Sequence, residues 1–304
     1  MEKTEKRSVL HMFDPMPHVS PFDINMAVDA GFDQIFPYDN VQQEQVNGLV
    51  QDAIFSRGPA GVKRTGIFIG GRDIGIALNM LDAARKAMVP PFVVSVLADP
   101  SGAFTTAAAL VACVEKQLKA HHGDELKGAQ AIVFGGTGPV GIATGVIASL
   151  AGANVTLVDP FNIDTALDKA REYNARCGST LVGTYASSDA DKARLLAQAD
   201  LVFCTAKAGI QVLNASVLAD ATQLKVAGDV NAVPPLGIEG IKRTHNGEPL
   251  LHAVNVPGAV GIGALAIGDI KYKLQNALLA SLLRAEEPVY MDFRADLEKA
   301  RAVV

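Results

Sequence analysis

Three glycines stand at a spacing that can hold a phosphate. They follow the apolar run 131–134, in the segment Gly135-Gly136-Thr137-Gly138-Pro139-Val140-Gly141. In a strand-to-helix turn, Gly136 permits the tight turn, Gly138 leaves room beside the backbone for a pyrophosphate, and Gly141 lets helix and strand pack closely. A proline suits the first helical turn, where its missing N–H costs nothing. The free N–H groups and the positive end of the helix dipole then face the phosphates. We therefore predict cofactor contacts at Gly136, Thr137, Gly138, Pro139 and Val140.

A carboxylate follows at the distance that a dinucleotide site requires. Asp159 ends the apolar run 155–158, about 20 residues beyond the glycines. Its oxygens can accept hydrogen bonds from the adenosine ribose hydroxyls. A 2′-phosphate would bring up to about two negative charges against it, and residues 160–163 contain no Lys or Arg to offset them. The sequence therefore predicts NAD as the cofactor and disfavours NADP. The alternatives are a tight turn that binds no nucleotide and, for Asp159, a carboxylate at a strand end on the surface.

Further cofactor contacts are predicted where later strands end. Ligands of open α/β sheets bind at the carboxyl ends of the strands, and small or polar residues follow several of these predicted ends. The residues so assigned are Ala206, Ala208, Asp229, Asn231, Gly263 and Leu265.

Short apolar runs alternate with helical patterns along the chain, which predicts an α/β fold with two parallel sheets. In the first part we expect strands at 9–13, 34–36, 65–69 and 92–97, and helices at 21–30, 43–55, 73–87 and 103–120. In the second part we expect strands at 131–134, 155–158, 180–182, 201–204 and 225–230, and helices at 140–151, 165–175, 189–199, 267–283 and 292–303. The polar run 121–128 marks a boundary, and the final helix is expected to pack back on the first domain.

Composition excludes several classes of protein. The 304 residues carry a formal charge of −5, with no basic cluster that would attract nucleic acid or an anionic membrane. No apolar stretch approaches the ~18 residues of a membrane span, and the start of the chain does not have the pattern of an export signal. The three cysteines and six histidines show no metal-ligand spacing, so no metal is expected. We therefore expect a cytoplasmic protein.

Five further segments carry a resemblance to a known family. They are Ser20-Pro21-Phe22-Asp23; residues 55–57 with 65–71; residues 98–102 with 104–106; residues 229–235; and residues 261–266 with 270–272. With these segments, the sequence resembles the bacterial NAD(P)-dependent methylene-tetrahydromethanopterin dehydrogenases of one-carbon metabolism, over nearly the whole chain.

The resemblance implies an N-terminal pterin-binding domain (residues 1–122), a Rossmann-type doubly wound parallel sheet (123–268), C-terminal helices on the first domain (269–304), and a cleft between the domains. It also implies a homo-oligomer, a trimer or hexamer. The implied reaction, in formaldehyde oxidation, moves a hydride from the methylene bridge of the pterin to the nicotinamide and leaves a methenyl cation. Two flanking nitrogens stabilise that cation, so positioning should dominate over acid or base catalysis.

By position in the family pattern, five residues are assigned to the substrate. Phe22 would contact the pterin ring, and Asp23, Asp99 and Thr105 would be polar partners. Lys271 would reach the substrate from the last helix and with Phe22 form the catalytic pair. The alternative for Phe22 is core packing, and for Lys271 a solvated helix face. The Tyr-xxx-Lys pair of the related folate dehydrogenase-cyclohydrolases is missing from the first domain, so no cyclohydrolase activity is expected.

Two other functions remain open from the residues alone. One is a different two-domain NAD(P) dehydrogenase, of the methylene-tetrahydrofolate or shikimate type. The other is a dinucleotide sensor without catalysis, which would keep the glycine turn and lack a substrate pocket.

Overall fold

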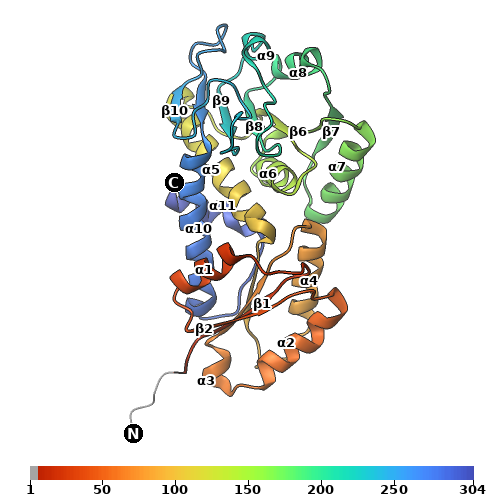
Figure 1. Cartoon of the computed structure of the whole chain (residues 1–304), viewed down its shortest axis with the longest axis vertical. Helices are drawn as coiled ribbons and strands as arrows, with labels where there is room; N and C mark the ends of the chain where they lie inside the picture. Colours follow the sequence, from red (N-terminus) through yellow and green to blue (C-terminus); the bar gives the residue numbers. More distant parts are fainter. Residues whose placement is uncertain (1–5) are drawn as a thin grey trace. The chain divides into compact units, whose positions relative to one another are not determined.

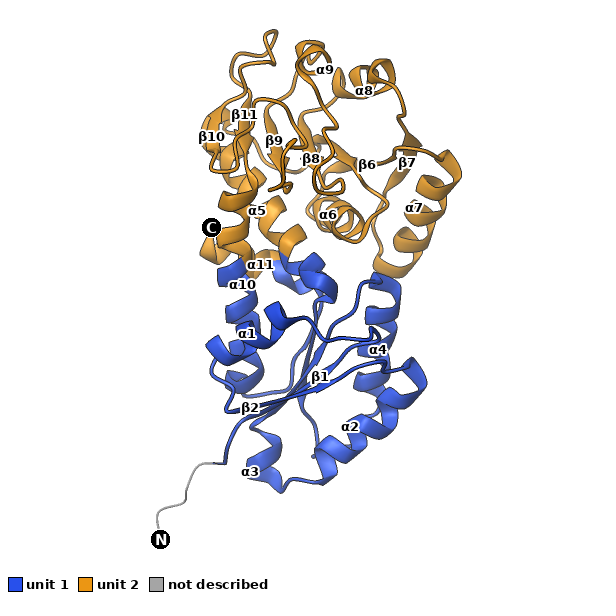
Figure 2. Ribbon diagram, viewed as in Figure 1, with its two compact units in different colours: residues 1–105, 272–296 blue, residues 106–271, 297–304 orange. Residues whose placement is uncertain are grey.

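The structure, a computed structural model, describes residues 6–304. Residues 1–5 lie outside the described residues. They belong to the charged start of the chain, which does not have the pattern of an export signal. The chain divides into two compact units, Met1–Thr105 with Tyr272–Asp296 and Thr106–Lys271 with Leu297–Val304, which Figure 2 colours separately. The predicted α/β architecture with two parallel sheets is confirmed.

The division between the units differs from the predicted boundary at residue 122. It falls between Thr105 and Thr106, near the start of helix α5 (Ala103–His122). The carboxylate of Asp99 binds backbone N–H groups of the first turn of α5, which ties that turn to unit 1. Farther along α5, the side chain of Leu110 lies against Gly228 in the sheet of unit 2. Helix α5 therefore begins in unit 1 and continues in unit 2. The polar run 121–128, from which the boundary was predicted, marks only the end of this helix.

Unit 1 is built on a five-stranded parallel sheet in the order β12-β4-β3-β1-β2. Its strands are β1 (Val9–Phe13), β2 (Gln34–Tyr38), β3 (Thr65–Ile69), β4 (Ser95–Ala98) and β12 (Tyr290–Met291). The central strand β3 is buried along its whole length, as expected for a parallel strand covered on both faces. Strand β4 begins later than the predicted residue 92 because Phe92 pairs back with Val89 in a turn.

Helices cover both faces of the unit 1 sheet (Figure 1). They are α1 (Pro21–Asp29), the 3-10 turn η1 (Gln43–Gln45), α2 (Val46–Phe55), α3 (Pro59–Val62), α4 (Ile74–Lys86), the 3-10 turn η2 (Pro100–Gly102) and, from Tyr272 onward, α10 (Ala264–Arg284). Helices α1 and α10 share one face, where Leu282 packs against Gly66 of β3. Helices α2 and α4 lie on the opposite face (Figure 1).

Unit 2 contains a seven-stranded sheet in the order β10-β11-β9-β8-β5-β6-β7. Its strands are β5 (Gln130–Phe134), β6 (Asn154–Asp159), β7 (Val182–Tyr185), β8 (Leu201–Cys204), β9 (Val226–Asp229), β10 (Asn246–Pro249) and β11 (Val260–Ile262). Counted from β5, the six parallel strands have the 3-2-1-4-5-6 order of the Rossmann fold, and the chain reverses its direction of winding between β5 and β8. The antiparallel edge strand β10 and the short parallel strand β11 beside it were not predicted.

Two layers of helices enclose this sheet, α6 (Pro139–Leu150) and α7 (Ile163–Cys177) among them. On the face where α6 lies, Gly145 approaches Leu157 of β6 closely. On the other face, α8 (Asp189–Leu196) and α9 (Ala215–Ala219) pack over an apolar cluster that includes Ile132 and Val202. Strand β7 begins after the predicted residue 180 because the Asn174 side chain at the end of α7 binds both backbone groups of Leu181.

The C-terminal segment, which was predicted to lie on the first domain, is divided between the two units. Strand β12 pairs with β4, and the chain as far as Asp296 belongs to unit 1. The rest of the last helix, α11 (Phe293–Val303), belongs to unit 2, where Arg301 donates to both carboxylate oxygens of Glu115 at 2.6 Å. A bidentate ion pair of this kind fixes the end of the helix in a way that apolar periodicity does not predict. Among residues 6–304, no helix has the length and apolar composition needed to cross a membrane.

Candidate functional site

The glycine turn joins β5 to α6, as the spacing predicts. The backbone N–H of Gly136 donates to the carbonyl of Val158 at 3.0 Å, which holds the turn against the end of β6. A Cβ on Gly141 would collide with the carbonyl oxygen of Gly135, so this position requires glycine for close packing of helix and strand. Pro139 is the first residue of α6.

Gly138 differs from its neighbours because nothing inside the protein requires a glycine there. Its φ of −79° suits any residue, and a Cβ would meet only the carbonyl oxygen of Gly135, at 3.5 Å. A side chain at position 138 would therefore clash with no protein atom, but it would lie over the amino end of α6. The bare backbone at this position leaves space for a ligand, and the residues present fit a dinucleotide pyrophosphate.

Asp159 is buried at the end of β6 and is anchored to the turn. One oxygen accepts the backbone N–H groups of Phe161 and Asn162, both at 2.8 Å, and the other accepts the Thr137 hydroxyl at 2.6 Å. Burial alone raises the pKa of Asp159, but these three hydrogen bonds outweigh it and hold the pKa below its ordinary value. The side chain is therefore an anion at neutral pH, and one acceptor site on its second oxygen is left for a ribose hydroxyl.

A cavity of about 540 Å³ lies at the carboxyl ends of β5, β6 and β8, at the point where the winding reverses. Its walls come from the glycine turn, the loop after β6, the start of α8 and the loop after β8: Phe134, Gly135, Thr137, Gly138, Val158, Asp159, Pro160, Phe161, Ala186, Ser187, Lys192, Thr205, Ala206, Lys207, Ile210, Gln211 and Val212. Four predicted cofactor residues line it, namely Thr137, Gly138, Asp159 and Ala206. Ligands of open α/β sheets bind at this place.

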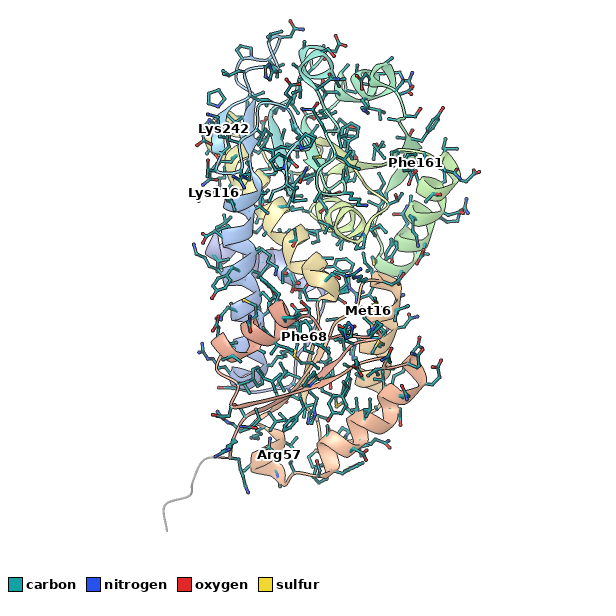
Figure 3. All side chains as sticks on the ribbon, in the orientation of Figure 1. Met16, Arg57, Phe68, Lys116, Phe161 and Lys242 are labelled. Carbon is teal, nitrogen blue, oxygen red and sulfur yellow. The ribbon has the colours of Figure 1, made fainter. Side chains whose placement is uncertain are left out.

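Among the wall residues that were not predicted, three carry an aromatic ring or a positive charge. Phe161, labelled in Figure 3, is 89% exposed and offers an aromatic face at the rim, which suits stacking with a base. Lys192 and Lys207 are cations on the wall. The signal that could have found Phe161 and Lys207 is their position three residues after a predicted strand end, whereas Lys192 lies within the predicted helix 189–199 and gives no such signal.

Other predicted cofactor residues have roles inside the protein. Asp229 is 1% exposed, and its carboxylate accepts the backbone N–H groups of Asn231 and Ile238. Burial raises the pKa of Asp229 above its ordinary value, and these N–H groups offset only part of that rise. The Asn231 amide accepts from Gly209 and Val233 and donates to the Pro235 carbonyl. The pair thus holds together the loops after β8 and β9 without lining the cavity.

Three more predicted residues also lie off the cavity wall. Ala208 is exposed in the loop after β8. A Cβ on Gly263 would collide with the carbonyl oxygen of Lys242, so this glycine serves close packing at the start of α10. Leu265 is exposed on the first turn of that helix. Within residues 6–304, the structure brings no three His, Cys, Asp or Glu side chains together as metal ligands.

In unit 1, Phe22 is half exposed on α1, whereas the predicted polar partners are buried. The carboxylate of Asp23 accepts the Gln275 side-chain amide at 2.8 Å, which joins α1 to α10. The carboxylate of Asp99 accepts the backbone N–H groups of Phe104 and Thr105 and the Thr105 hydroxyl, at 2.7 to 3.2 Å. Asp99 therefore caps α5, and Thr105 completes the cap.

Sequence reasoning missed Asp14, which connects three strand ends. Its carboxylate follows β1 and accepts the backbone N–H groups of Met16, labelled in Figure 3, and of Gly71, which follows β3. Ser101, after β4, donates to the carbonyl of Gly71 at 2.8 Å. Burial raises the pKa of Asp14 above its ordinary value, more than the two N–H groups lower it. The carboxyl edge of the unit 1 sheet is therefore held together by hydrogen bonds of the Asp14 and Ser101 side chains.

The buried cap of α5 leads to a stability prediction. Asp99→Ala removes the acceptor of two backbone donors and a hydroxyl, so we expect the free energy of unfolding to fall by about 2 to 3 kcal/mol. Chemical denaturation followed by circular dichroism measures the loss. Asp73→Ala is the matched control, because Asp73 caps α4 at an exposed position through one bond to Ile76, and we expect it to lose about 1 kcal/mol. Equal losses for the two variants would contradict the assigned role of Asp99.

Lys271 lies in the middle of α10, which is the penultimate helix, and it is partly buried. It precedes Gln275 by one helical turn, so the two side chains project from the same face of the helix. The helix thus carries both a buried amide and a cation on one side.

Comparison of the sequence with known proteins shows which family the chain is similar to. The family described as "Methylene-tetrahydromethanopterin dehydrogenase, N-terminal" matches residues 21–101. A Methylorubrum extorquens protein named NAD(P)-dependent methylenetetrahydromethanopterin dehydrogenase is 44% identical over 95% of this chain and 96% of its own length. Another protein of that organism, named bifunctional protein MdtA, is 34% identical over 93% of this chain and 95% of its own length.

Solved structures share the fold at much lower identity. Shikimate 5-dehydrogenase from Listeria monocytogenes, solved with shikimate and NAD, has a TM-score of 0.54 and 14% identity over 96% of both chains. This likeness shows the fold alone. The identity to the first relative, in contrast, extends along nearly all of both chains and includes both units. The chain therefore belongs to the methylenetetrahydromethanopterin dehydrogenase family.

Proposed function

We propose that this protein oxidises methylene-tetrahydromethanopterin to the methenyl form with a nicotinamide dinucleotide as hydride acceptor. The observation that carries the proposal is the cavity at the end of β5, with bare backbone at Gly138 and the anchored anion Asp159, in a chain that is 44% identical to a dehydrogenase of that name. The 14% likeness to shikimate dehydrogenase supports no choice of substrate.

In this reaction the residues of the chain bind the dinucleotide and the pterin and orient them relative to each other. The bound nicotinamide supplies the hydride acceptor. The amino end of α6 would hold the pyrophosphate, Asp159 would accept a ribose hydroxyl, and Ala206 would leave the backbone after β8 open to the ligand. The two nitrogens beside the pterin's bridge carbon stabilise the cation that hydride loss creates, so no side chain has to supply an acid or base.

For the cofactor, the proposal includes a preference for NAD over NADP. Asp159 is ionised and held in place by three hydrogen bonds, so it cannot turn away from an incoming 2′-phosphate without losing them. The repulsion would act on NADP, whereas NAD would donate a hydrogen bond from a free ribose hydroxyl.

For the substrate, we assign direct contact to the exposed Phe22 and to Lys271, and positioning to Asp23, Asp99 and Thr105. Phe22 offers its ring to solvent, which suits stacking with a pterin. The other three are engaged in hydrogen bonds inside unit 1 and support the elements that carry the site. The proposal extends to a place in one-carbon oxidation and to a homo-oligomer, a trimer or hexamer, both of which the family resemblance implies. It also extends to a cytoplasmic location, which the composition implies.

One assay tests the proposed reaction. Purified protein is mixed with methylene-tetrahydromethanopterin and NAD or NADP, and the absorbance of the reduced nicotinamide is followed. We expect turnover with both cofactors and a larger kcat/KM with NAD. Turnover only with methylene-tetrahydrofolate or with shikimate would replace the substrate, and cofactor binding without turnover on any of the three would indicate a sensor.

A further inference from the structure

A cation shares the cavity with Asp159. Lys192, on the first turns of α8, lines the cavity together with Asp159 and Pro160, and its side chain is only 18% exposed. Its ammonium group is paired with one carboxylate oxygen of Asp189 at 3.1 Å. Sequence reasoning found no cation to offset a 2′-phosphate because it considered only the residues directly after Asp159, and Lys192 follows the next strand.

The order of strands places Lys192 on the adenosine side of the cavity. Strand β6, which ends in Asp159, lies between β5 and β7, and α8 begins shortly after β7. The second cation of the wall, Lys207, follows β8, which lies on the other side of β5. A dinucleotide whose pyrophosphate lies over the turn after β5 therefore has its adenosine ribose between Asp159 and α8, away from Lys207.

We propose that Lys192 binds the 2′-phosphate of NADP and so allows this chain to use NADP despite Asp159. The inference rests on the proposed function in one respect, namely that the cavity binds a nicotinamide dinucleotide. It assigns to Lys192 the choice between the two cofactors and leaves the chemistry of the pterin untouched.

The ion pair between Lys192 and Asp189 can break with little loss of stability. The second carboxylate oxygen of Asp189 accepts the Asn214 side-chain amide at 2.7 Å, so Asp189 keeps a partner when the ammonium group turns into the cavity. Asp189 is itself more than half exposed, and water replaces what it loses. A phosphate with up to about two negative charges attracts an ammonium group more strongly than a solvated carboxylate does.

Removal of the charge gives the first test. Calorimetric titration of the full chain with NADP and with NAD, in the absence of pterin, is expected to show that Lys192→Gln raises the Kd for NADP about tenfold and leaves the Kd for NAD within about twofold. Lys192→Arg keeps the charge and is expected to retain most of the NADP affinity. Lys169→Gln is the matched control, because Lys169 forms a similar i,i+3 ion pair on α7 without lining the cavity.

A second variant has the opposite sign. Asp189→Asn frees Lys192 from its carboxylate partner, so we expect it to lower the Kd for NADP while the Kd for NAD stays the same. An unchanged NADP affinity in Lys192→Gln, or an equal loss for both cofactors, would overturn the inference. The proposed reaction fails separately, if pterin is not oxidised although Lys192→Gln still weakens NADP alone. If the unmutated protein binds neither NAD nor NADP, both the proposed reaction and the inference about Lys192 are wrong.

Discussion

Gly138→Ala is expected to raise the Kd for NAD about fiftyfold. The added methyl group stands over the amino end of α6, where the pyrophosphate must approach the backbone, and separation of the two breaks hydrogen bonds that together contribute about 2 to 3 kcal/mol. The fold should not change, because the nearest protein atom to the new Cβ is 3.5 Å away and the backbone angles suit alanine. Titration with NAD and thermal unfolding without ligand measure the two effects separately.

Gly268→Ala is the matched control for that substitution. Gly268 lies in α10, no atom stands within 4 Å of its Cβ position, and it does not line the cavity. We expect NAD affinity in this variant to be unchanged. Should Gly138→Ala bind NAD as tightly as Gly268→Ala does, the pyrophosphate does not lie over this turn and the assignment of the cavity is wrong.

Asp159→Ala is expected to lower the ratio of kcat/KM for NAD to that for NADP about a hundredfold. The NAD reaction loses a hydrogen bond to the ribose, and the NADP reaction loses a repulsion between like charges, at roughly tenfold each. Asp159→Asn removes the negative charge but keeps the loop in place, since its amide oxygen can still accept the N–H groups of Phe161 and Asn162. This variant therefore distinguishes the effect of the charge from a loss of loop structure. A ratio that stays the same in both variants would discredit the role of Asp159.

The pH dependence of this preference follows from the sign of the pKa shift. Burial raises the pKa of Asp159, and the bonds from Thr137, Phe161 and Asn162 lower it by more, so the net pKa is below its ordinary value. A group with a lowered pKa contributes stability above its unfolded pKa, and the contribution is lost as pH falls through the folded value. The NAD preference should therefore stay constant from about pH 6 to about pH 9, far above an ordinary aspartate pKa of about 4. Steady-state ratios across that range check this.

The cofactor turn was predictable because its parts are neighbours along the chain. Strand β5, the glycines, α6 and β6 form one continuous β-α-β unit, in which the spacing of residues determines which groups meet. Asp159 could be located for the same reason. The limits of most elements followed from apolar periodicity. Strand β7 starts late because the Asn174 side chain binds backbone before it, and strand β4 starts late because Phe92 pairs back with Val89.

The substrate residues were less predictable because their partners are distant in sequence. Position in a family pattern identified Asp23 but not the Gln275 amide that binds it from α10. It identified Asp99 without revealing that the carboxylate is used to cap a helix. A polar residue that serves a ligand and one that serves the fold have the same appearance in a sequence, and only burial and hydrogen-bond partners distinguish them.

The sequence by itself determined the α/β class, the glycine turn and the acid that meets the ribose, since these depend on contacts within about 25 residues of chain. The tertiary structure alone decided which side chains form the rest of the cavity wall. Lys192 and Lys207 reach opposite sides of it because the sheet order places β7 and β8 on opposite sides of β5. The tertiary structure also placed Asp229 inside the protein, where it binds backbone instead of lining the cavity. Strand order results from the packing of the whole sheet, and no local spacing encodes it.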